Sequence, residues 1–337
     1  MRAVVHGRYG DPADLVVRDL PVPEPGPDEV LVRVRAASVH PDVWHVVTGR
    51  PYVLRLMGSG LRRPKVSVPG TDLAGVVERV GGSVTRFRPG DEVFGEAIRG
   101  VQWVNGATYA ELACAPEEGL AVKPADASFE EAATVPTAGL IALQNLASVG
   151  QVRPGERVLV NGAAGGVGGL AVQLAVAAGA VVTGVDSAAK EDVVRRLGAE
   201  RFVDFTTVDF TREADRYDLV FDVPGNHPLR AVRRVIAPGG RYVLIGHDAF
   251  GTAGRRWLGS IPRFVRLMAM SFFVRELPRP DFAAQDKAIA MARLADLLAE
   301  GRLTPVIDRA FPLEEAAQAL GYLASGQARG RVVLTVS

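Results

Sequence analysis

The pattern of hydrophobic and polar positions in the first third of the chain predicts strands. Residues 29–39 alternate, with Val30, Val32 and Val34 on one face of an extended segment. Short apolar runs then recur at residues 73–81, 88–95 and 107–115, separated by Gly, Pro and Asp. We expect these strands to form a small, irregular barrel.

From about residue 120 the pattern predicts helices that alternate with strands. Residues 128–146 have helical spacing, and Ser128 is a candidate N-terminal cap. Beyond them, strands are predicted at 158–160, 181–186, 201–205, 218–223 and 241–246, with helices at 167–178 and 190–197. Buried strands that alternate with helices form a parallel sheet covered on both faces. Two more helices, at 288–300 and 313–324, and a strand at 329–337 complete the chain.

A glycine-rich turn provides the strongest candidate for a binding site. The predicted strand at 158–160 runs through Gly162, Gly165, Gly166 and Gly168 directly into a helix. Glycines allow the backbone to turn tightly and to approach a pyrophosphate, which the N–H groups at the helix start can bind. With a strand before the turn and a helix after it, the sequence predicts a dinucleotide site.

Two residues near the end of the next predicted strand, Asp186 and Lys190, give opposite indications about which dinucleotide binds. Asp186 ends the strand about twenty residues further on, where a carboxylate accepts hydrogen bonds from ribose hydroxyls and repels a 2′-phosphate. This favours NAD. Lys190, with the hydroxyl of Ser187, could instead bind a 2′-phosphate, unless it is simply a solvated helix residue.

Composition excludes several other classes of protein. The chain has 337 residues, which suggests two domains, and a net charge of +1, which offers little attraction for nucleic acid or an anionic membrane. The single cysteine, Cys114, excludes an internal disulfide and Cys-rich metal sites. No signal peptide or membrane-spanning run is evident, so we expect a cytosolic protein.

Several motifs in the same order resemble the medium-chain dehydrogenase/reductase superfamily, above all its zinc-free quinone oxidoreductase branch. They are MRAVV, PGTDLAGVVERVG, RPGDEVFG, NGAAGGVG, RRLGAERFVDF, APGGRYVLIG and ARGRVVLTV, and together they span nearly the whole chain. The resemblance implies an α/β protein with a GroES-like β-rich catalytic domain at 1–119 and 302–337. A Rossmann domain with a doubly wound parallel sheet would occupy 120–301, with the active site between them, in a homodimer.

The resemblance also implies that no zinc is bound. The catalytic zinc ligands of the alcohol dehydrogenase branch fall here on His40, Thr71 and Thr137, and threonine is not a normal zinc ligand. Without metal, the family chemistry is hydride transfer from a reduced nicotinamide to an electron-poor acceptor, either a quinone or an α,β-unsaturated carbonyl compound. The partner would thus be a small hydrophobic carbonyl or quinone substrate, with neither nucleic acid nor a membrane involved.

Two residues are candidates for catalysis. Tyr52 matches by position a proposed proton donor of enoyl-thioester reductases, although it could merely line the cleft. His40 stands where the quinone branch usually has asparagine, and it could donate a hydrogen bond or a proton to the acceptor, or simply pack there. Trp44 and His45 are expected to be packing residues.

The cofactor is predicted to be NADP(H) by a small margin over NAD(H). Lys190 matches a lysine that binds the 2′-phosphate in the NADPH-using branch, whereas Asp186 replaces a glycine there and Phe205 a tyrosine. The full set of predicted cofactor-binding residues is Thr137, Gly162, Ala163, Gly165, Gly166, Val167, Gly168, Asp186, Ser187, Lys190 and Gly246.

Two other functions stay open. An enoyl-thioester reductase would need a basic groove for the phosphate-bearing arm of its substrate, for which Arg255, Arg256, Arg263 and Arg266 are candidates. The third hypothesis is a non-catalytic NADPH-binding protein with a regulatory or structural role.

Overall fold

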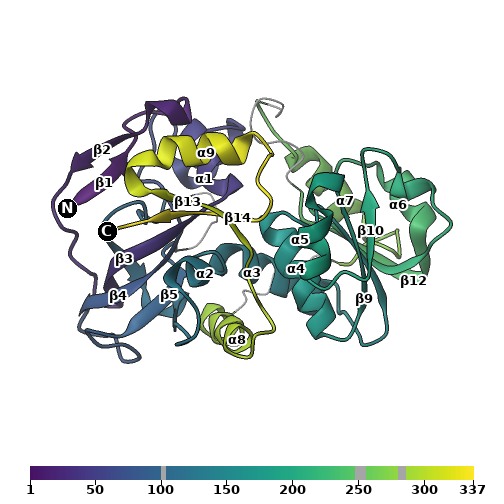
Figure 1. The fold of residues 1–337 in the computed structure, drawn as a ribbon. Coiled ribbons are helices and arrows are strands. Elements are labelled where there is room, and N and C mark those ends of the chain that lie inside the picture. Colours follow the sequence, from purple (N-terminus) through teal and green to yellow (C-terminus); the bar gives the residue numbers. More distant parts are fainter. Residues whose placement is uncertain (100–103, 247–255, 280–285) are drawn as a thin grey trace.

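The computed structural model describes residues 1–99, 104–246, 256–279 and 286–337. It has two lobes side by side, with both chain termini in the same lobe (Figure 1). Among the helices in these ranges, none combines the length and apolar character needed to cross a lipid bilayer.

The first lobe is built around a seven-stranded sheet in the order β13-β14-β3-β4-β5-β7, with β6 paired to β3. The pairs are antiparallel except β13 with β14. The alternation predicted for residues 29–39 is confirmed, because Val30, Val32 and Val34 are buried while Arg33 and Arg35 are exposed. The strands are β3 (Glu29–Val39), β4 (Asp72–Val80), β5 (Glu92–Glu96), β6 (Leu112–Pro116), β7 (Leu120–Val122), β13 (Ile307–Pro312) and β14 (Arg331–Thr335).

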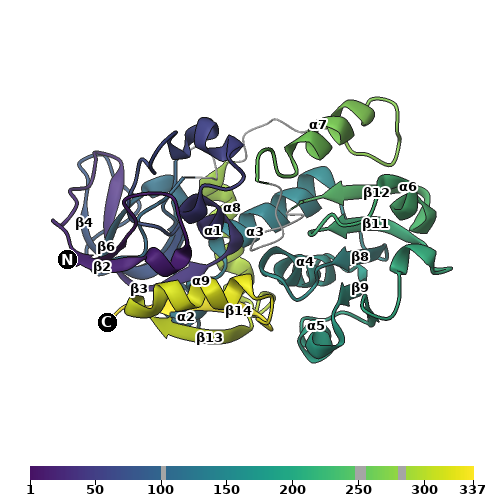
Figure 2. The same ribbon diagram turned by 90° about the horizontal axis from the view of Figure 1, so that it is seen from above.

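Smaller elements complete this lobe. A two-stranded sheet of β1 (Arg2–Val5) and β2 (Val16–Asp19) was not predicted. Helix α1 (Pro41–Thr48) was also missed: every residue from Asp42 onward is buried, so its sequence shows no polar face. It lies beside α9 (Ala316–Ala324), as Figure 2 shows.

The second lobe contains a parallel five-stranded sheet in the order β10-β9-β8-β11-β12. Its strands are β8 (Arg157–Asn161), β9 (Val181–Asp186), β10 (Arg201–Asp204), β11 (Tyr217–Asp222) and β12 (Ile236–Leu244). The chain order reverses between β8 and β11, and this is the point where open α/β sheets bind ligands beyond the carboxyl ends of their strands.

Both faces of this sheet are covered, as predicted. Val158 and Val160 pack in one apolar cluster with α4, whereas Leu159, which points the other way, packs in a second cluster against Leu267 and Met270 of α7. The helices are α3 (Pro136–Gln144), α4 (Gly166–Ala177), α5 (Glu191–Arg196), α6 (Leu229–Val232), α7 (Ile261–Met270) and α8 (Lys287–Ala299).

The segment predicted as one helix at 128–146 is two. Helix α2 (Phe129–Ala133) begins with a capping box in which the backbone N–H of Glu131 donates to Ser128 Oγ, and that of Ser128 donates to the Glu131 carboxylate. Pro136 then starts α3, since proline suits the first turn of a helix but not its interior.

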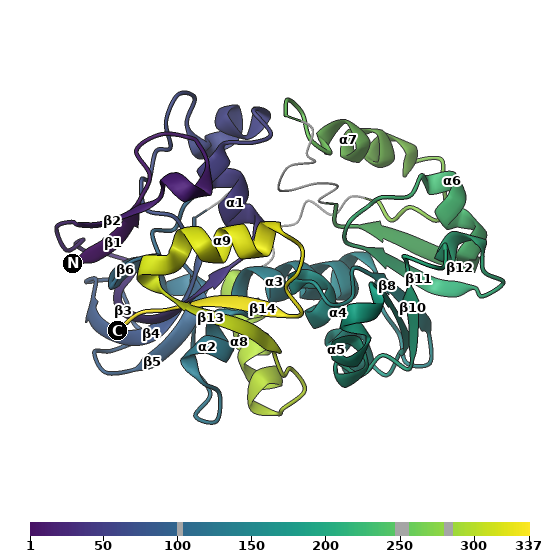
Figure 3. The ribbon, with the colours of Figure 1, turned by 45° about the horizontal axis from the view of Figure 1, so that its top comes forward.

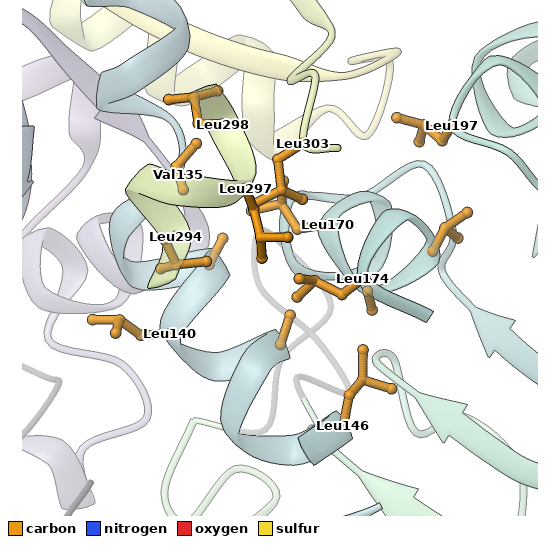
Figure 4. Close-up of a cluster of buried hydrophobic side chains, with 14 of the residues drawn as sticks. Val135, Leu140, Leu146, Leu170, Leu174, Leu197, Leu294, Leu297, Leu298 and Leu303 are labelled. Atoms are coloured by element: carbon orange, nitrogen blue, oxygen red, sulfur yellow. The ribbon is translucent and has the colours of Figure 1, made fainter. Parts of the chain in front are cut away.

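Helix α8 packs α3 and α4 together. Its Leu294 and Leu297 lie in the same apolar cluster as Leu140 of α3 and Leu170 of α4 (Figure 4). Lys287, at the start of α8, reaches the first lobe, where its ammonium donates to the Ile98 carbonyl. Helix α8 therefore contacts both lobes, packing on α3 of the second lobe and on β7 of the first.

Candidate active site

The glycine-rich turn has the geometry that a dinucleotide requires. Gly162 has a φ of +81°, a backbone conformation that disfavours other residues. A Cβ on Gly168 would lie 2.0 Å from the carbonyl oxygen of Gly162, so only glycine allows α4 to begin this close to the turn. The N–H groups at the start of α4 remain available to an anion.

A cleft of about 360 Å³ runs from this turn to the first lobe. Its walls come from the turn and strand ends of the second lobe and from β3, α1 and β14 of the first. Eight of the predicted site residues line it: His40, Thr137, Gly162, Gly165, Gly166, Val167, Asp186 and Lys190. The cleft thus brings residues from about 40 to 330 into a single site.

Arg331, which the sequence analysis did not identify, lies at the glycine turn. It belongs to β14 of the first lobe, yet a Cβ on Gly166 would meet its Nη1 at 1.9 Å. Its Nη2 donates to the Thr134 carbonyl at 2.6 Å, while its Nε is buried without a hydrogen-bond partner in the described part of the chain. Burial lowers the pKa of Arg331 to about 10, so the guanidinium stays charged at neutral pH.

A buried guanidinium with an unpaired Nε, placed against the first turn of α4, fits a bound pyrophosphate. Two independent features of the cleft, the glycine turn and this cation, therefore fit a bound dinucleotide. Arg331 could have been noticed in the sequence because it begins a predicted strand in which the next three residues are apolar. Buried arginines are rare, so an arginine at such a position indicates a specific role.

At the end of the cleft formed by β9, the backbone holds the side chain of Asp186. Its Oδ2 accepts from the N–H of Ala164 at 3.0 Å and its Oδ1 from the N–H of Ser187 at 2.9 Å. Lys190 Nζ lies 3.8 Å from Oδ1, which offsets the charge of the carboxylate. Phe205, half exposed, offers a flat apolar surface at the same end.

At the other end, His40 and two threonines form a buried polar group. His40 Nε2 lies 2.6 Å from Thr71 Oγ1, in a hydrogen bond whose direction depends on the imidazole tautomer. Thr71 Oγ1 lies in turn 3.5 Å from Thr137 Oγ1. His40 occupies the N-cap position of α1 and is only 5% exposed, so burial and the contact with Thr71 hold its ring at the cleft wall.

Behind the threonines, two buried carboxyl groups share a proton. Thr137 Oγ1 lies 2.5 Å from Asp72 Oδ1 and 2.8 Å from Glu96 Oε1, yet a hydroxyl donates only one hydrogen. One of these contacts therefore needs a carboxyl proton. Burial raises the pKa of both Asp72 and Glu96, and the Lys287 ammonium, 2.7 Å from Glu96 Oε2, partly opposes this for Glu96.

The remaining predicted residues lie outside the cleft lining. Ala163 is fully buried behind the turn and Gly168 supports it from within α4. Ser187 follows Asp186, while Gly246 packs against Phe264. Tyr52 lines a separate hollow of about 830 Å³ together with Tyr9, Trp44 and Arg55. Their functional roles stay predictions.

The predicted packing residues and arginines can also be placed. Trp44 and His45 are buried in α1, as expected. Arg263 donates to the His227 carbonyl and to Tyr242 Oη, so its guanidinium forms hydrogen bonds within the second lobe. Arg256 and Arg266 are exposed, and Arg255 lies outside the described residues.

Metal ligands were sought in the same ranges. In the part of the chain that the structure describes, no three His, Cys, Asp or Glu side chains converge as they would to hold a metal ion. The hydroxyls of Thr71 and Thr137 are instead engaged with Asp72, Glu96 and His40.

Comparison with known proteins shows the family to which the chain belongs. Residues 26–145 match the alcohol dehydrogenase GroES-like domain, and residues 197–334 match the zinc-binding dehydrogenase family model. The chain is 30% identical to the chloroplastic quinone-oxidoreductase QR1 of Triphysaria versicolor, over 99% of this chain and 98% of that protein. It is 31% identical to the chloroplastic NADPH-dependent alkenal/one oxidoreductase of Arabidopsis thaliana, over 99% and 79%.

Solved structures show the same likeness. The quinone oxidoreductase from Coxiella burnetii superposes with a TM-score of 0.83 at 29% identity, covering 100% of this chain and 99% of that one. The geometry defines a two-lobed protein whose cleft, with its glycine turn at a helix start, suits a dinucleotide. The chain belongs to the medium-chain dehydrogenase/reductase superfamily, in its quinone oxidoreductase-like branch.

Proposed function

We propose that this protein is a zinc-independent, NAD(P)H-dependent reductase that transfers hydride to a quinone or an α,β-unsaturated carbonyl compound. The observation that carries the proposal is the cleft itself, which joins a glycine cradle to a polar group in which threonines occupy two of the three zinc-ligand positions. The names of the relatives, among them an alkenal/one oxidoreductase, support this acceptor class.

The residues of this chain would hold the cofactor along the length of the cleft. The N–H groups of the turn and the Arg331 guanidinium would bind the pyrophosphate, and Asp186, Lys190 and Phe205 would surround the adenosine. When bound, the reduced nicotinamide supplies the hydride. Because Lys190 already offsets the charge of Asp186, we favour NADPH slightly over NADH.

His40 would serve the acceptor. Its contact with Thr71 fixes the ring at the cleft wall, so that it can donate a hydrogen bond, or a proton, to the oxygen on which negative charge develops. A cytosolic location and a homodimer stay predictions from the sequence.

The test is the fall in absorbance at 340 nm with NADPH or NADH, against a quinone, an enone, an enoyl thioester and a simple aldehyde, with and without a chelator. We expect oxidation with the quinone or enone, unaffected by the chelator. Turnover confined to the thioester, or chelator-sensitive turnover of the aldehyde, would contradict the proposal. Cofactor binding without turnover of any acceptor would favour the non-catalytic hypothesis.

A paired variant sharpens the cofactor assignment. Lys190→Ala should weaken NADPH binding roughly tenfold, the value of one charge-assisted hydrogen bond, and leave NADH binding nearly unchanged. The matched control is Lys65→Ala, which removes an exposed lysine of the other lobe. An equal effect of Lys190→Ala on both cofactors would show that Lys190 does not contact the 2′-phosphate.

A further inference from the structure

The exposed apolar side chains of this protein are concentrated in two segments. Of the 17 large hydrophobic residues that are exposed among those the structure describes, nine fall between residues 56 and 61 or between 257 and 273. They include the side chains with the greatest exposure, Phe273 at 89%, Leu56 at 75% and Trp257 at 74%. The nine are Leu56, Met57, Leu61, Trp257, Leu258, Val265, Met268, Phe272 and Phe273.

These two segments adjoin each other although they belong to different lobes. The backbone N–H of Tyr52 donates to the Arg256 carbonyl at 2.7 Å, and that of Val53 donates to the Trp257 carbonyl at 3.0 Å. The rings of Tyr52 and Trp257 meet edge to face, 5.2 Å between centroids. Figure 3 shows α7 and the helical turns that follow α1 on the same side of the molecule.

Helix α7 presents apolar side chains both inward and outward. Phe264, Leu267 and Met270 pack into the second lobe, as a helix of a globular protein requires. Val265 and Met268 point outward and are exposed, where polar residues would be expected on a solvated helix. An outer face of this kind indicates a partner.

The charge of the same two segments identifies the partner. Residues 51–71 contain four Arg or Lys and no Asp or Glu, and residues 256–275 again contain four and none, although the whole chain carries only +1. Six of these cations are exposed and form no ion pair within the described part of the chain: Arg62, Arg63, Lys65, Arg256, Arg266 and Arg275.

We propose that this apolar–basic face, made of the nine apolar residues and six cations above, docks onto the surface of an anionic lipid bilayer. Arginine and lysine beside exposed Trp, Phe and Leu are the composition of segments that lie in the membrane interface. A second copy of the chain fits less well, because a two-fold contact through this face would place the cations against one another. The expectation of no membrane contact relied on net charge, which averages out a local patch.

Docking would also matter for substrate access. The face includes Trp257, which packs on Tyr52 at the junction of the two lobes. A lipophilic acceptor dissolved in the bilayer would then reach the enzyme without crossing water. This consequence rests on the proposed function, whereas the lipid binding itself does not.

The experiment is flotation of the full-length protein with vesicles of phosphatidylcholine alone or with 40% phosphatidylglycerol. We expect binding only to the anionic vesicles, weakened by salt. Phe272→Ser with Phe273→Ser should reduce binding at least about tenfold, and Arg62→Ser with Arg63→Ser roughly thirtyfold at low salt. The controls are Ile289→Ser and Arg88→Ser, which remove an exposed apolar and an exposed basic side chain elsewhere.

A second readout reports contact directly. Trp257 emission should shift to shorter wavelength with anionic vesicles, and Trp257→Phe should abolish the shift, while thermal denaturation confirms that each variant is folded. Equal binding to neutral vesicles, or binding unchanged in both double variants, would overturn the proposal. So would a concentration-dependent dimer that the Phe272/Phe273 variant dissociates, since this face would then be a subunit interface. Neither outcome bears on turnover measured with a water-soluble acceptor.

Discussion

At the cofactor end of the cleft the backbone sets the shape, whereas at the acceptor end side chains do so. The positive φ at Gly162 and the close approach of the Gly162 carbonyl to Gly168 disfavour other residues, and the turn presents backbone N–H groups, which every residue except proline carries. The acceptor end depends on the identities of His40, Thr71 and Thr137 and on the proton held behind them. The first kind of site is hard to alter, while the second can change its chemistry by single substitutions.

The largest effect is expected where the backbone leaves no space. Gly168→Ala would place a Cβ 2.0 Å from the Gly162 carbonyl and should weaken binding of both NADPH and NADH by roughly a hundredfold, measured by fluorescence titration. The matched control is Gly169→Ala, one residue along α4, whose Cβ would meet the flexible end of Leu197 at 3.2 Å and the Ala163 carbonyl oxygen at 3.5 Å, an ordinary van der Waals distance. Similar losses in both variants would show that helix propensity or folding, and not the turn, is responsible.

A substitution of Arg331 tests whether a side chain of the first lobe helps the glycine turn of the second lobe to bind the cofactor. Arg331→Met should weaken NADPH and NADH equally, by about thirtyfold, because the pyrophosphate is common to both. Arg329→Met, which removes an exposed neighbour, serves as control. A loss confined to NADPH would place the guanidinium at the 2′-phosphate instead.

At the acceptor end we expect a smaller effect, on turnover and not on cofactor binding. His40→Phe removes the hydrogen bond to Thr71 and should lower kcat/KM for the acceptor about tenfold, with the dissociation constant of NADPH unchanged. His40→Asn, which restores the residue usual in this branch, should recover part of the activity. Unaltered turnover in His40→Phe would show that the imidazole only packs there.

The smallest effect concerns the shared proton. Because burial raises the pKa of Asp72 above its unfolded value near 4, the folded state binds a proton more tightly. This contribution to stability is present below pH 4 and is lost as pH rises towards the folded pKa. Asp72→Asn cannot titrate, so the thermal midpoint should fall less between pH 4 and pH 8, by roughly 2–4 °C.

Exposed Asp126 provides the control for this measurement, because Asp126→Asn changes one carboxylate that lies in solvent. It should leave the pH profile of the thermal midpoint as in the unsubstituted protein. An identical profile in Asp72→Asn would mean that Glu96 holds the proton.

The sequence predicted those parts of the molecule that depend on local periodicity or on backbone geometry. The strand at residues 29–39, the parallel sheet and the glycine turn follow from spacing alone, and the N-terminal cap at Ser128 follows from the residue type and the helical spacing after it. Helix α1 was missed because its burial on all sides removes the amphipathic signal. The break at Pro136 was overlooked because the apolar pattern continues across it.

Side-chain contacts between distant segments were not predictable in the same way. Arg331 reaches Gly166 only because β14 pairs with β3 in the first lobe, a register that no local pattern specifies. The shared proton of Asp72 and Glu96 depends on three strand and helix ends meeting at Thr137. Tyr52, predicted from a positional match, lines a hollow apart from the main cleft.

The position of Arg331 limits how the two lobes can be recombined. If Arg331 binds the pyrophosphate as proposed, a chimaera that takes residues 120–301 from a relative, in order to exchange cofactor preference, would still depend on an arginine of the recipient. The two lobes are thus separate in fold, but both would contribute residues to binding the same cofactor. On the proposed role of Arg331, lobe exchange should preserve cofactor affinity only where β14 is transplanted with the Rossmann sheet, or where both parents carry a cation at this position.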